Sequence, residues 1–249
     1  MDDILWIVAL GAVAAGFVQG LSGFAFGLVA MSFWAWSLEP QLAAALSVFG
    51  ALTGQIIAAV TMRRGMHFSL LWPFLAGGLI GMPIGLFVLP LLNVALFKAF
   101  LGALLVLWCP AMLVSSRLPR ISNPPRWADA LAGLIGGVMG GLGGFAGAVP
   151  TLWCLLCGYD KDRQRAVIQN FNLTILATAM LGYALTGLAS WSMLPYFGVV
   201  ALAVLVPVLL GARLYIGISE AQFRMIVLSL LTASGVALLA SSLPKLLTS

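Results

Sequence analysis

The sequence has few charged residues, one histidine and three cysteines. Charged residues make up 8% of its 249 residues, whereas they make up roughly a quarter of a soluble domain, whose surface they cover. Apolar residues make up 62%. Most of the outer surface therefore cannot face water, which excludes a soluble enzyme, a nucleic-acid-binding protein and a disordered scaffold. The chain is predicted to be an all-α polytopic membrane protein whose surroundings are the lipid bilayer.

The few histidines and cysteines also argue against a metal or redox centre. Cys154 and Cys157 form a C-x-x-C motif, but the residues between them are leucines. A zinc or redox site needs polar neighbours and further ligands. These thiols are predicted to be small core residues, and no metal, cofactor or catalytic residue is predicted. The net charge of +5 is typical of a membrane protein that keeps cations in its cytoplasmic loops.

Apolar stretches divide the chain into helices and two interrupted segments. A spanning helix needs about 20 apolar residues. Stretches that fit one crossing are 41–62, 68–90, 94–114, 165–186, 192–212 and 223–243. Two other stretches, 4–37 and 128–157, are too long for one helix, and glycines cluster at 20–23 and 140–144 within them. Because glycine costs about 1 kcal/mol in a helix interior, each is predicted to be a helix broken in the middle, either crossing or re-entrant.

Related residues recur at a spacing of 121 positions. This shift places Gly23-Phe24-Ala25 on Gly144-Phe145-Ala146, and Thr53 on Thr174. Each half of the chain is therefore predicted to be a repeat, formed by one broken segment and three helices. The predicted repeats are residues 1–114 and 128–249, and the basic linker between them is 115–127. A duplicated membrane unit with paired broken helices is typical of transporters whose site lies between the repeats.

The positions of the cations suggest an orientation. Many lie between the apolar stretches, as do Arg63, Arg64 and those of the Lys161–Arg165 loop. If each broken segment enters and leaves on one side, these loops face the cytoplasm, and six crossings form inverted repeats. If each broken segment crosses once, eight spans form parallel repeats and the Lys161–Arg165 loop faces outward. The tendency of cations to remain in the cytoplasm favours six crossings.

The segment Gly16–Gly27 resembles the glycine-rich opening of the sulfite exporter TauE/SafE family, also called the 4-toluene sulfonate uptake permease family. Gly140–Gly144 and Gly158–Lys161 are similar to parts of that family's second repeat. The resemblance extends from about Gly11 to Leu239. It implies a transporter of small sulfur-containing anions, such as sulfite, sulfoacetate or other organosulfonates, in a bacterial inner membrane.

An anion inside a membrane needs hydrogen-bond donors, and no cation lies at the centre of an apolar stretch. A half-helix that restarts after a glycine break offers unpaired N–H groups and the positive end of its dipole. Two such ends facing each other, with nearby side chains, are predicted to hold the substrate. The predicted site residues are Gln19, Ser22, Gly23, Phe24, Thr53, Gln55, Gly144, Phe145, Asn170, Asn172 and Thr174. Structural hydrogen bonds between helices are the alternative role for the polar ones.

Efflux is the predicted direction of transport, because the membrane potential drives an anion outward by about 2.3 kcal/mol per charge per 100 mV. A homodimer is left open. The first alternative is an anion or neutral-solute channel of the same fold. The second is an intramembrane serine protease, suggested by Gly20-Leu21-Ser22-Gly23. It is disfavoured because the single histidine, His67, lies in a loop, away from the serine that it would have to activate.

Overall fold

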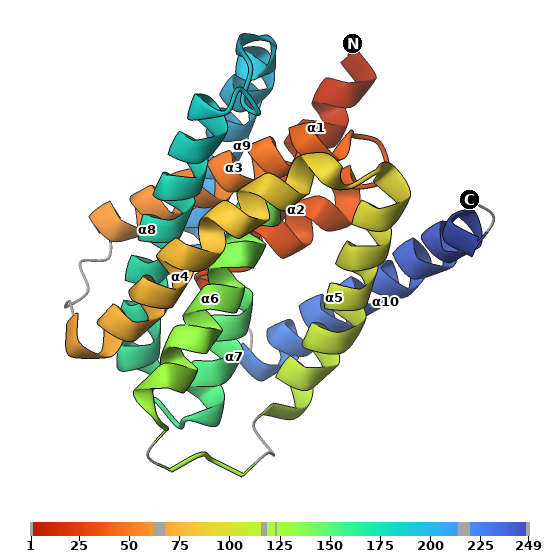
Figure 1. The fold of residues 1–249 in the computed structure, drawn as a ribbon. Coiled ribbons are helices and arrows are strands. Elements are labelled where there is room, and N and C mark those ends of the chain that lie inside the picture. Colours follow the sequence, from red (N-terminus) through yellow and green to blue (C-terminus); the bar gives the residue numbers. More distant parts are fainter. Residues whose placement is uncertain (1, 62–67, 116–118, 123, 214–219, 248–249) are drawn as a thin grey trace.

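The structure is a computed structural model that describes residues 2–61, 68–115, 119–122, 124–213 and 220–247, and every regular element in these ranges is a helix (Figure 1). The predicted all-α fold is confirmed. The first half contains α1 (Asp2–Ser22), α2 (Phe26–Trp34), α3 (Pro40–Thr61), α4 (Phe68–Val88), the 3₁₀-helix η1 (Leu89–Leu91) and α5 (Val94–Val114). The second half contains α6 (Arg126–Gly143), α7 (Ala148–Leu156), α8 (Lys161–Leu185), the 3₁₀-helix η3 (Trp191–Met193), α9 (Leu194–Arg213) and α10 (Glu220–Leu247).

Both predicted helix breaks occur, each at a glycine with a left-handed backbone. α1 ends just before Gly23, whose φ is 86°, and α6 ends just before Gly144, whose φ is 80°. A residue with a Cβ atom rarely adopts this conformation, whereas glycine adopts it without steric cost. The glycine clusters therefore stop one helix and let a second, shorter helix start in a new direction.

Each short helix folds back along the helix that precedes it. Trp34, at the end of α2, donates from Nε1 to the carbonyl oxygen of Ile7 in α1 at 3.2 Å. Trp153, near the end of α7, donates from Nε1 to Oδ1 of Asp129 in the first turn of α6 at 2.7 Å. Both broken segments are thus helical hairpins, which is the geometry that the six-crossing interpretation requires. The division of the chain into two repeats stays a prediction.

The most extensive helix contact joins α4 to α6 through glycines spaced four residues apart on both helices. They are Gly77, Gly81 and Gly85 on α4, and Gly133, Gly137 and Gly141 on α6. A Cβ atom built on Gly81 would meet the carbonyl oxygen of Leu134, and one built on Gly137 would meet the carbonyl oxygen of Gly78. The two backbones are therefore in direct contact, which only small residues permit.

Other contacts also join helices from the two halves of the chain. α1 packs on α9 as α6 packs on α4, and α3 packs on α9 as α8 packs on α4. α3 also packs on α8, and α5 packs on α10. Helices of the two halves therefore interleave around one core, and neither half forms a separate body.

Six helical segments of the described chain are long and apolar enough to cross a membrane. They are Ile4–Ser22, Pro40–Thr61, Phe68–Leu91, Val94–Val114, Trp191–Arg213 and Met225–Leu246. α8 contains residues 165–185 of the predicted stretch 165–186 but is not among these six. Its N-terminal half carries charged residues together with the amides Gln169, Asn170 and Asn172, which lower its hydropathy. α8 packs against both α3 and α4, and Asn172 is buried while Gln169 and Asn170 are half-buried.

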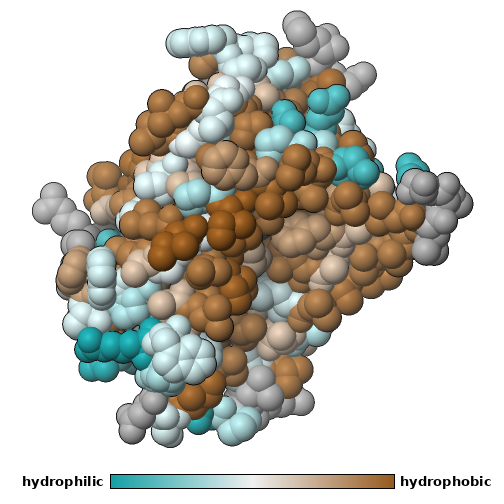
Figure 2. All heavy atoms as spheres, in the orientation of Figure 1, coloured by the Kyte–Doolittle hydropathy of each residue, from teal (hydrophilic) through white to brown (hydrophobic). Residues whose placement is uncertain are grey.

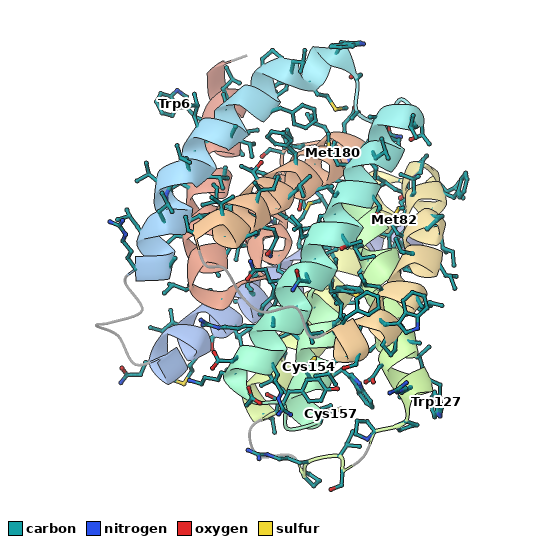
Figure 3. The ribbon with its side chains drawn as sticks, turned by 90° about the vertical axis from the view of Figure 1, so that its left-hand side faces the viewer. Trp6, Met82, Trp127, Cys154, Cys157 and Met180 are labelled. Atoms are coloured by element: carbon teal, nitrogen blue, oxygen red, sulfur yellow. The ribbon has the colours of Figure 1, made fainter. Side chains whose placement is uncertain are left out.

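The outer surface is apolar, as the lipid-facing surface of a membrane protein must be. Brown, apolar residues cover most of the face shown in Figure 2, and teal residues gather at its margins. Trp6 and Trp127, each 69% exposed, lie at opposite ends of the molecule (Figure 3). Tryptophan prefers the boundary between lipid and water. The chain is therefore a multi-pass membrane protein with aromatic residues at both boundaries.

Candidate substrate cavity at the first helix break

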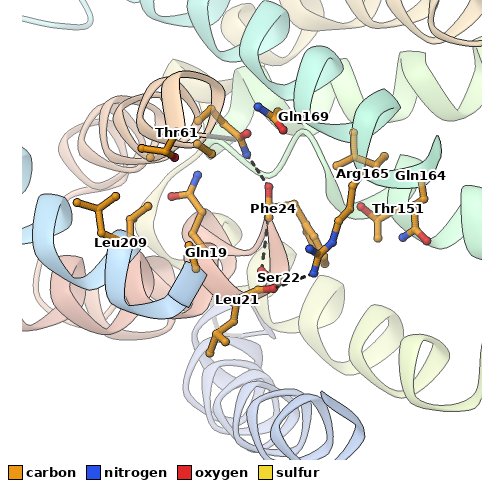
Figure 4. A pocket seen from close by; sticks show the side chains of 18 residues that line it. Gln19, Leu21, Ser22, Phe24, Thr61, Thr151, Gln164, Arg165, Gln169 and Leu209 are labelled. Atoms are coloured by element: carbon orange, nitrogen blue, oxygen red, sulfur yellow. Dashed lines mark hydrogen bonds between the residues drawn. The ribbon is translucent and has the colours of Figure 1, made fainter. Parts of the chain in front are cut away.

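A cavity of about 130 Å³ lies beside the first helix break (Figure 4). The end of α1 and the break itself contribute one part of its lining, from Gln19 to Phe24. Side chains of α3, α7, α8 and α9 complete the lining. The cavity therefore lies between the two halves of the chain, where the sequence predicts a transporter to bind its substrate.

Two polar side chains hold the break in its shape. Gln55 on α3 donates from Nε2 to the carbonyl oxygen of Gly23 at 2.6 Å. The hydroxyl oxygen of Ser22 accepts hydrogen bonds from the backbone N–H groups of Ala25 at 3.2 Å and Phe24 at 3.4 Å. Ser22 thus satisfies N–H groups that the interrupted helix leaves unpaired. Both side chains have a structural role at a position that also lines the cavity.

Two other lining side chains are buried and carry a polar atom without a partner in the described structure. Gln19, 3% exposed, donates from Nε2 to the carbonyl oxygen of Ala51 at 2.9 Å, and its Oε1 has no partner there. Thr151, 2% exposed, likewise has an unpartnered Oγ1. A buried polar atom left unpaired costs about 1–3 kcal/mol.

Arg165 brings a positive charge to the cavity from the first turns of α8. Its Nη2 donates to the carbonyl oxygen of Leu21 at 3.5 Å, so the guanidinium reaches the end of α1 (Figure 4). Arg165 is absent from the residues predicted from sequence, because Lys161–Arg165 was predicted to be a loop. Asp160 is the residue that indicates the earlier start of this helix. Its side chain accepts a hydrogen bond from the backbone N–H of Arg163 at 2.9 Å and so caps the N-terminus of α8. A helix that begins after this cap carries Arg165 and Gln169 on one face, and both line the cavity.

Five predicted site residues come together at the cavity, and the others lie elsewhere. The five are Gln19, Ser22, Gly23, Phe24 and Gln55. Thr53, Thr174 and Asn170 are outside its lining, and each donates to a carbonyl oxygen four residues earlier in its own helix, at 2.8, 2.9 and 2.8 Å respectively. These bonds are structural but lie within one helix, so they differ from the hydrogen bonds between helices that were the predicted alternative. No observation tests their binding role, which stays a prediction.

The remaining predicted residues, Gly144, Phe145 and Asn172, lie where the second break packs against the first. A Cβ atom on Gly27 would come within 2.8 Å of the carbonyl oxygen of Gly144 and within 3.1 Å of the Phe145 ring. One on Gly147 would lie 2.7 Å from Nδ2 of Asn172. Asn172 is buried, and its Oδ1 has no partner in the described residues. The two breaks therefore touch, and whether these residues bind substrate stays a prediction.

The structure does not favour Ser22 as a protease nucleophile, or Cys154 and Cys157 as a metal or redox site. The Ser22 hydroxyl caps the break, and His67 lies outside the described residues. No cluster of three or more metal-binding side chains occurs in the described part of the chain. Cys154 is buried and Cys157 is half-buried near it (Figure 3). Burial, followed by the nearby Asp129 carboxylate, raises the pKa of the Cys157 thiol to about 11, which makes it a weak nucleophile at neutral pH.

The fold and the cavity define a class of protein: a multi-pass α-helical membrane protein with a cavity of polar and apolar side chains where a helix breaks inside an apolar body. The family model described as sulfite exporter TauE/SafE matches residues 8–238. The chain therefore belongs to the TauE/SafE family of membrane transporters, and the resemblance noted in its sequence is confirmed. Searches of curated proteins and of solved structures find no match.

Proposed function

We propose that this transporter exports a small sulfur-containing anion, such as sulfite, sulfoacetate or another organosulfonate, across a bacterial inner membrane. The observation that carries this proposal is the charge of the cavity. Among the described residues, Arg165 is the one charged side chain in the lining, and it is a cation accompanied by amide and hydroxyl groups. A unit anion 4 Å from such a cation gains about 4 kcal/mol at an effective dielectric constant of about 20.

The position of the cavity supports loading from the cytoplasm. Its lining includes Thr61, Gln164 and Ala212, near the ends of α3, α8 and α9. Lys161 and Arg213 lie at the same helix ends. Because cations concentrate on the cytoplasmic side, this end of the molecule is assigned to the cytoplasm. An anion that enters there is driven outward by the membrane potential.

The break supports binding in a second way. Ser22, Gly23 and Phe24 line the cavity, and one residue, Ala25, separates them from the start of α2. The positive end of the α2 dipole therefore adjoins the cavity and favours an anion. In this proposal the second break, with Asn172 beside it, forms the wall through which the anion leaves toward the outside.

Binding by detergent-purified protein tests the proposal. A thermal-shift panel compares sulfite, sulfate, sulfoacetate, taurine, an aryl sulfonate, acetate and chloride. A ligand at about 100 times its Kd stabilises a single-site protein by about 2.7 kcal/mol. Arg165→Gln is expected to weaken binding by at least tenfold, because a hydrogen bond to a charged group contributes about 1.5–3 kcal/mol. Arg165→Lys retains the charge and is expected to keep part of the affinity.

Arg163→Gln is the matched control, since Arg163 lies one half-turn away on α8 and pairs with Asp160 at the exposed surface at 3.0 Å. Its anion affinity is expected to equal that of the wild type. Equal losses in both variants, or no stabilisation by any sulfur oxyanion at millimolar concentration, would reject the proposed site. Anion efflux from proteoliposomes that saturates with concentration would favour a carrier over the channel alternative.

A further inference from the structure

The two helical hairpins are closed by tryptophans that donate to chemically different acceptors. In the first hairpin, formed by α1 and α2, Trp34 donates from Nε1 to the backbone carbonyl oxygen of Ile7 at 3.2 Å. In the second, formed by α6 and α7, Trp153 donates from Nε1 to the side-chain oxygen Oδ1 of Asp129 at 2.7 Å. A carboxylate takes up a proton in an accessible pH range, and a backbone carbonyl does not. The closing contact of the second hairpin is therefore able to respond to pH.

The carboxyl group of Asp129 is buried although the surface lies one helical turn away. Asp129 is 6% exposed, and it is the one carboxylate among the buried residues of the described chain. Arg126 and Trp127, which precede it in α6, are exposed, and Trp127 marks this end of the molecule in Figure 3. Water thus reaches the residues just before Asp129, while the closed hairpin covers the carboxyl group itself.

A hairpin of this kind closes without a carboxylate. The position 121 residues before Asp129 is Val8, which is fully buried in the first hairpin. Burying a carboxylate costs more free energy than one hydrogen bond from a neutral donor returns. A buried carboxylate where the other hairpin has valine therefore points to a role beyond packing.

The surroundings of Asp129 have opposing effects on its charge. Burial favours the neutral, protonated carboxyl group. The Trp153 donor, the positive charge of Arg126 and the start of the α6 dipole favour the carboxylate. Because the cost of burial exceeds what a neutral donor and an exposed cation return, the closed hairpin holds a proton more tightly than a hydrated carboxyl group would.

Other ionisable side chains near this site do not compete for that proton. α7 contributes Cys154 and Cys157, and Tyr159 follows it; thiols and phenols are neutral at neutral pH. The helices α3 and α4, which pack against α6, carry no ionisable side chain. The ionisable side chains of α8 are Lys161, Asp162, Arg163, Arg165 and Tyr183. Within the α6–α7 hairpin, Asp129 is thus the group that exchanges a proton at or below neutral pH.

We propose that Asp129 is a proton-binding site that couples the second hairpin to pH. The closed hairpin covers the carboxyl group, whereas an open hairpin would hydrate it. By linkage, protonation stabilises the closed hairpin, and loss of the proton favours opening. Thr151 on α7 lines the cavity two residues before Trp153, so opening alters the cavity wall. The proton site does not depend on which ligand the cavity takes.

Two buried thiols measure opening of the hairpin. Cys154 lies next to Trp153 on α7, and Cys109 lies on α5, outside the hairpin. Mass spectrometry follows their modification by 4,4′-dithiodipyridine in detergent, without added substrate, from about pH 4.5 to 8. The ratio of the Cys154 rate to the Cys109 rate removes the pH dependence that both thiols share.

The ratio is expected to rise with pH and then to level off once Asp129 is ionised in both forms of the hairpin. One proton limits the rise to about tenfold per pH unit. The charge of Asp129 disfavours the Cys154 thiolate, so this charge alone would lower the ratio. A rise therefore reports opening.

Variants assign the pH dependence to one residue. Asp129→Asn has a neutral side chain of the same shape at every pH, and its ratio is expected to stay at the low-pH value of the wild type. Trp153→Phe keeps the carboxyl group but removes the donor that favours its charged form, so the rise is expected at higher pH. Asp162→Asn is the matched control, because Asp162 is exposed in the first turn of α8; its profile is expected to match the wild type.

Several outcomes would overturn the proton site. They are a ratio that is flat or falls with pH in the wild type, a rise that persists in Asp129→Asn, and an equal loss of the rise in Asp162→Asn. The wild-type and Trp153→Phe profiles test the site without relying on the folding of Asp129→Asn. Because the assay contains no substrate, its failure leaves the proposed anion transport intact, and failure of the anion-binding panel leaves the proton site intact.

Discussion

Gly81→Ala tests whether contact between the backbones of α4 and α6 stabilises the fold. A Cβ atom at this position would meet the carbonyl oxygen of Leu134 and would lie 2.9 Å from its carbonyl carbon and 3.0 Å from the backbone nitrogen of Val138. All three neighbours are backbone atoms, which no rotamer change can move aside. The methyl group would therefore have to push the helices apart along their most extensive contact.

The magnitude follows from two opposing effects. Overpacking a well-packed core costs about 1–3 kcal/mol, and the rigid neighbours of Gly81 place the cost near the upper value. Replacing glycine by alanine in a helix returns about 1 kcal/mol. The net loss expected for Gly81→Ala is thus about 2 kcal/mol. Gly198→Ala is the matched control, because Gly198 lies in α9 with open space around it, and it is expected to gain up to about 1 kcal/mol.

Thermal unfolding in detergent, followed by tryptophan fluorescence, compares the two variants. The difference of about 3 kcal/mol corresponds to about 6–12 °C in Tm, since 1 kcal/mol shifts Tm by about 2–4 °C for a protein of 150–250 residues. If Gly81→Ala unfolds at or above the Tm of Gly198→Ala, close backbone packing does not hold these helices together, and the reasoning fails.

Two further predictions concern the break and the thiol beside the second hairpin. Gly23→Ala has open space around its Cβ atom but retains a φ of 86°, so it is expected to lose about 1–2 kcal/mol from backbone strain alone; an unchanged Tm would contradict the left-handed conformation. Alkylation of Cys157, followed by mass spectrometry, is expected to accelerate about tenfold per pH unit from pH 7 to 10, because only the thiolate reacts and its pKa is raised to about 11. A rate that levels off below pH 9 would show that burial does not suppress ionisation.

Much of the fold was predictable because membrane helices follow strong local rules. Long apolar stretches and glycine clusters located the helices and both breaks, since glycine is the residue that tolerates the conformation found at Gly23 and Gly144. The predicted helix begins at residue 165, whereas α8 begins at Lys161. Apolar content alone does not register Asp160, which caps this helix. Hydropathy located the apolar part of α8 but does not show where its charged first turn begins.

The site was predictable only in part, because a cavity depends on contacts between distant helices. Gln19, Ser22 and Gln55 were accessible to sequence reasoning, since they lie at the break or face it from the next helix. Arg165 reaches Leu21 across 144 positions of sequence, and no local pattern predicts that approach. The contribution of α9 was equally hidden, because Leu209, which lines the cavity, is as apolar as the exposed Leu210 beside it.

The two breaks show that a broken helix does not by itself make a binding site. The position 121 residues after Gln19 is Gly140, where a Cβ atom would lie 2.8 Å from Cγ2 of Ile175. Ile175 is fully buried and fills space at the second break, whereas the first break has a cavity beside it. Likewise, the position 121 residues before Arg165 is Ala44, which is also fully buried. Similar backbone breaks thus occur in unlike surroundings, and the function proposed above depends on the side chains around the first break and not on the break alone.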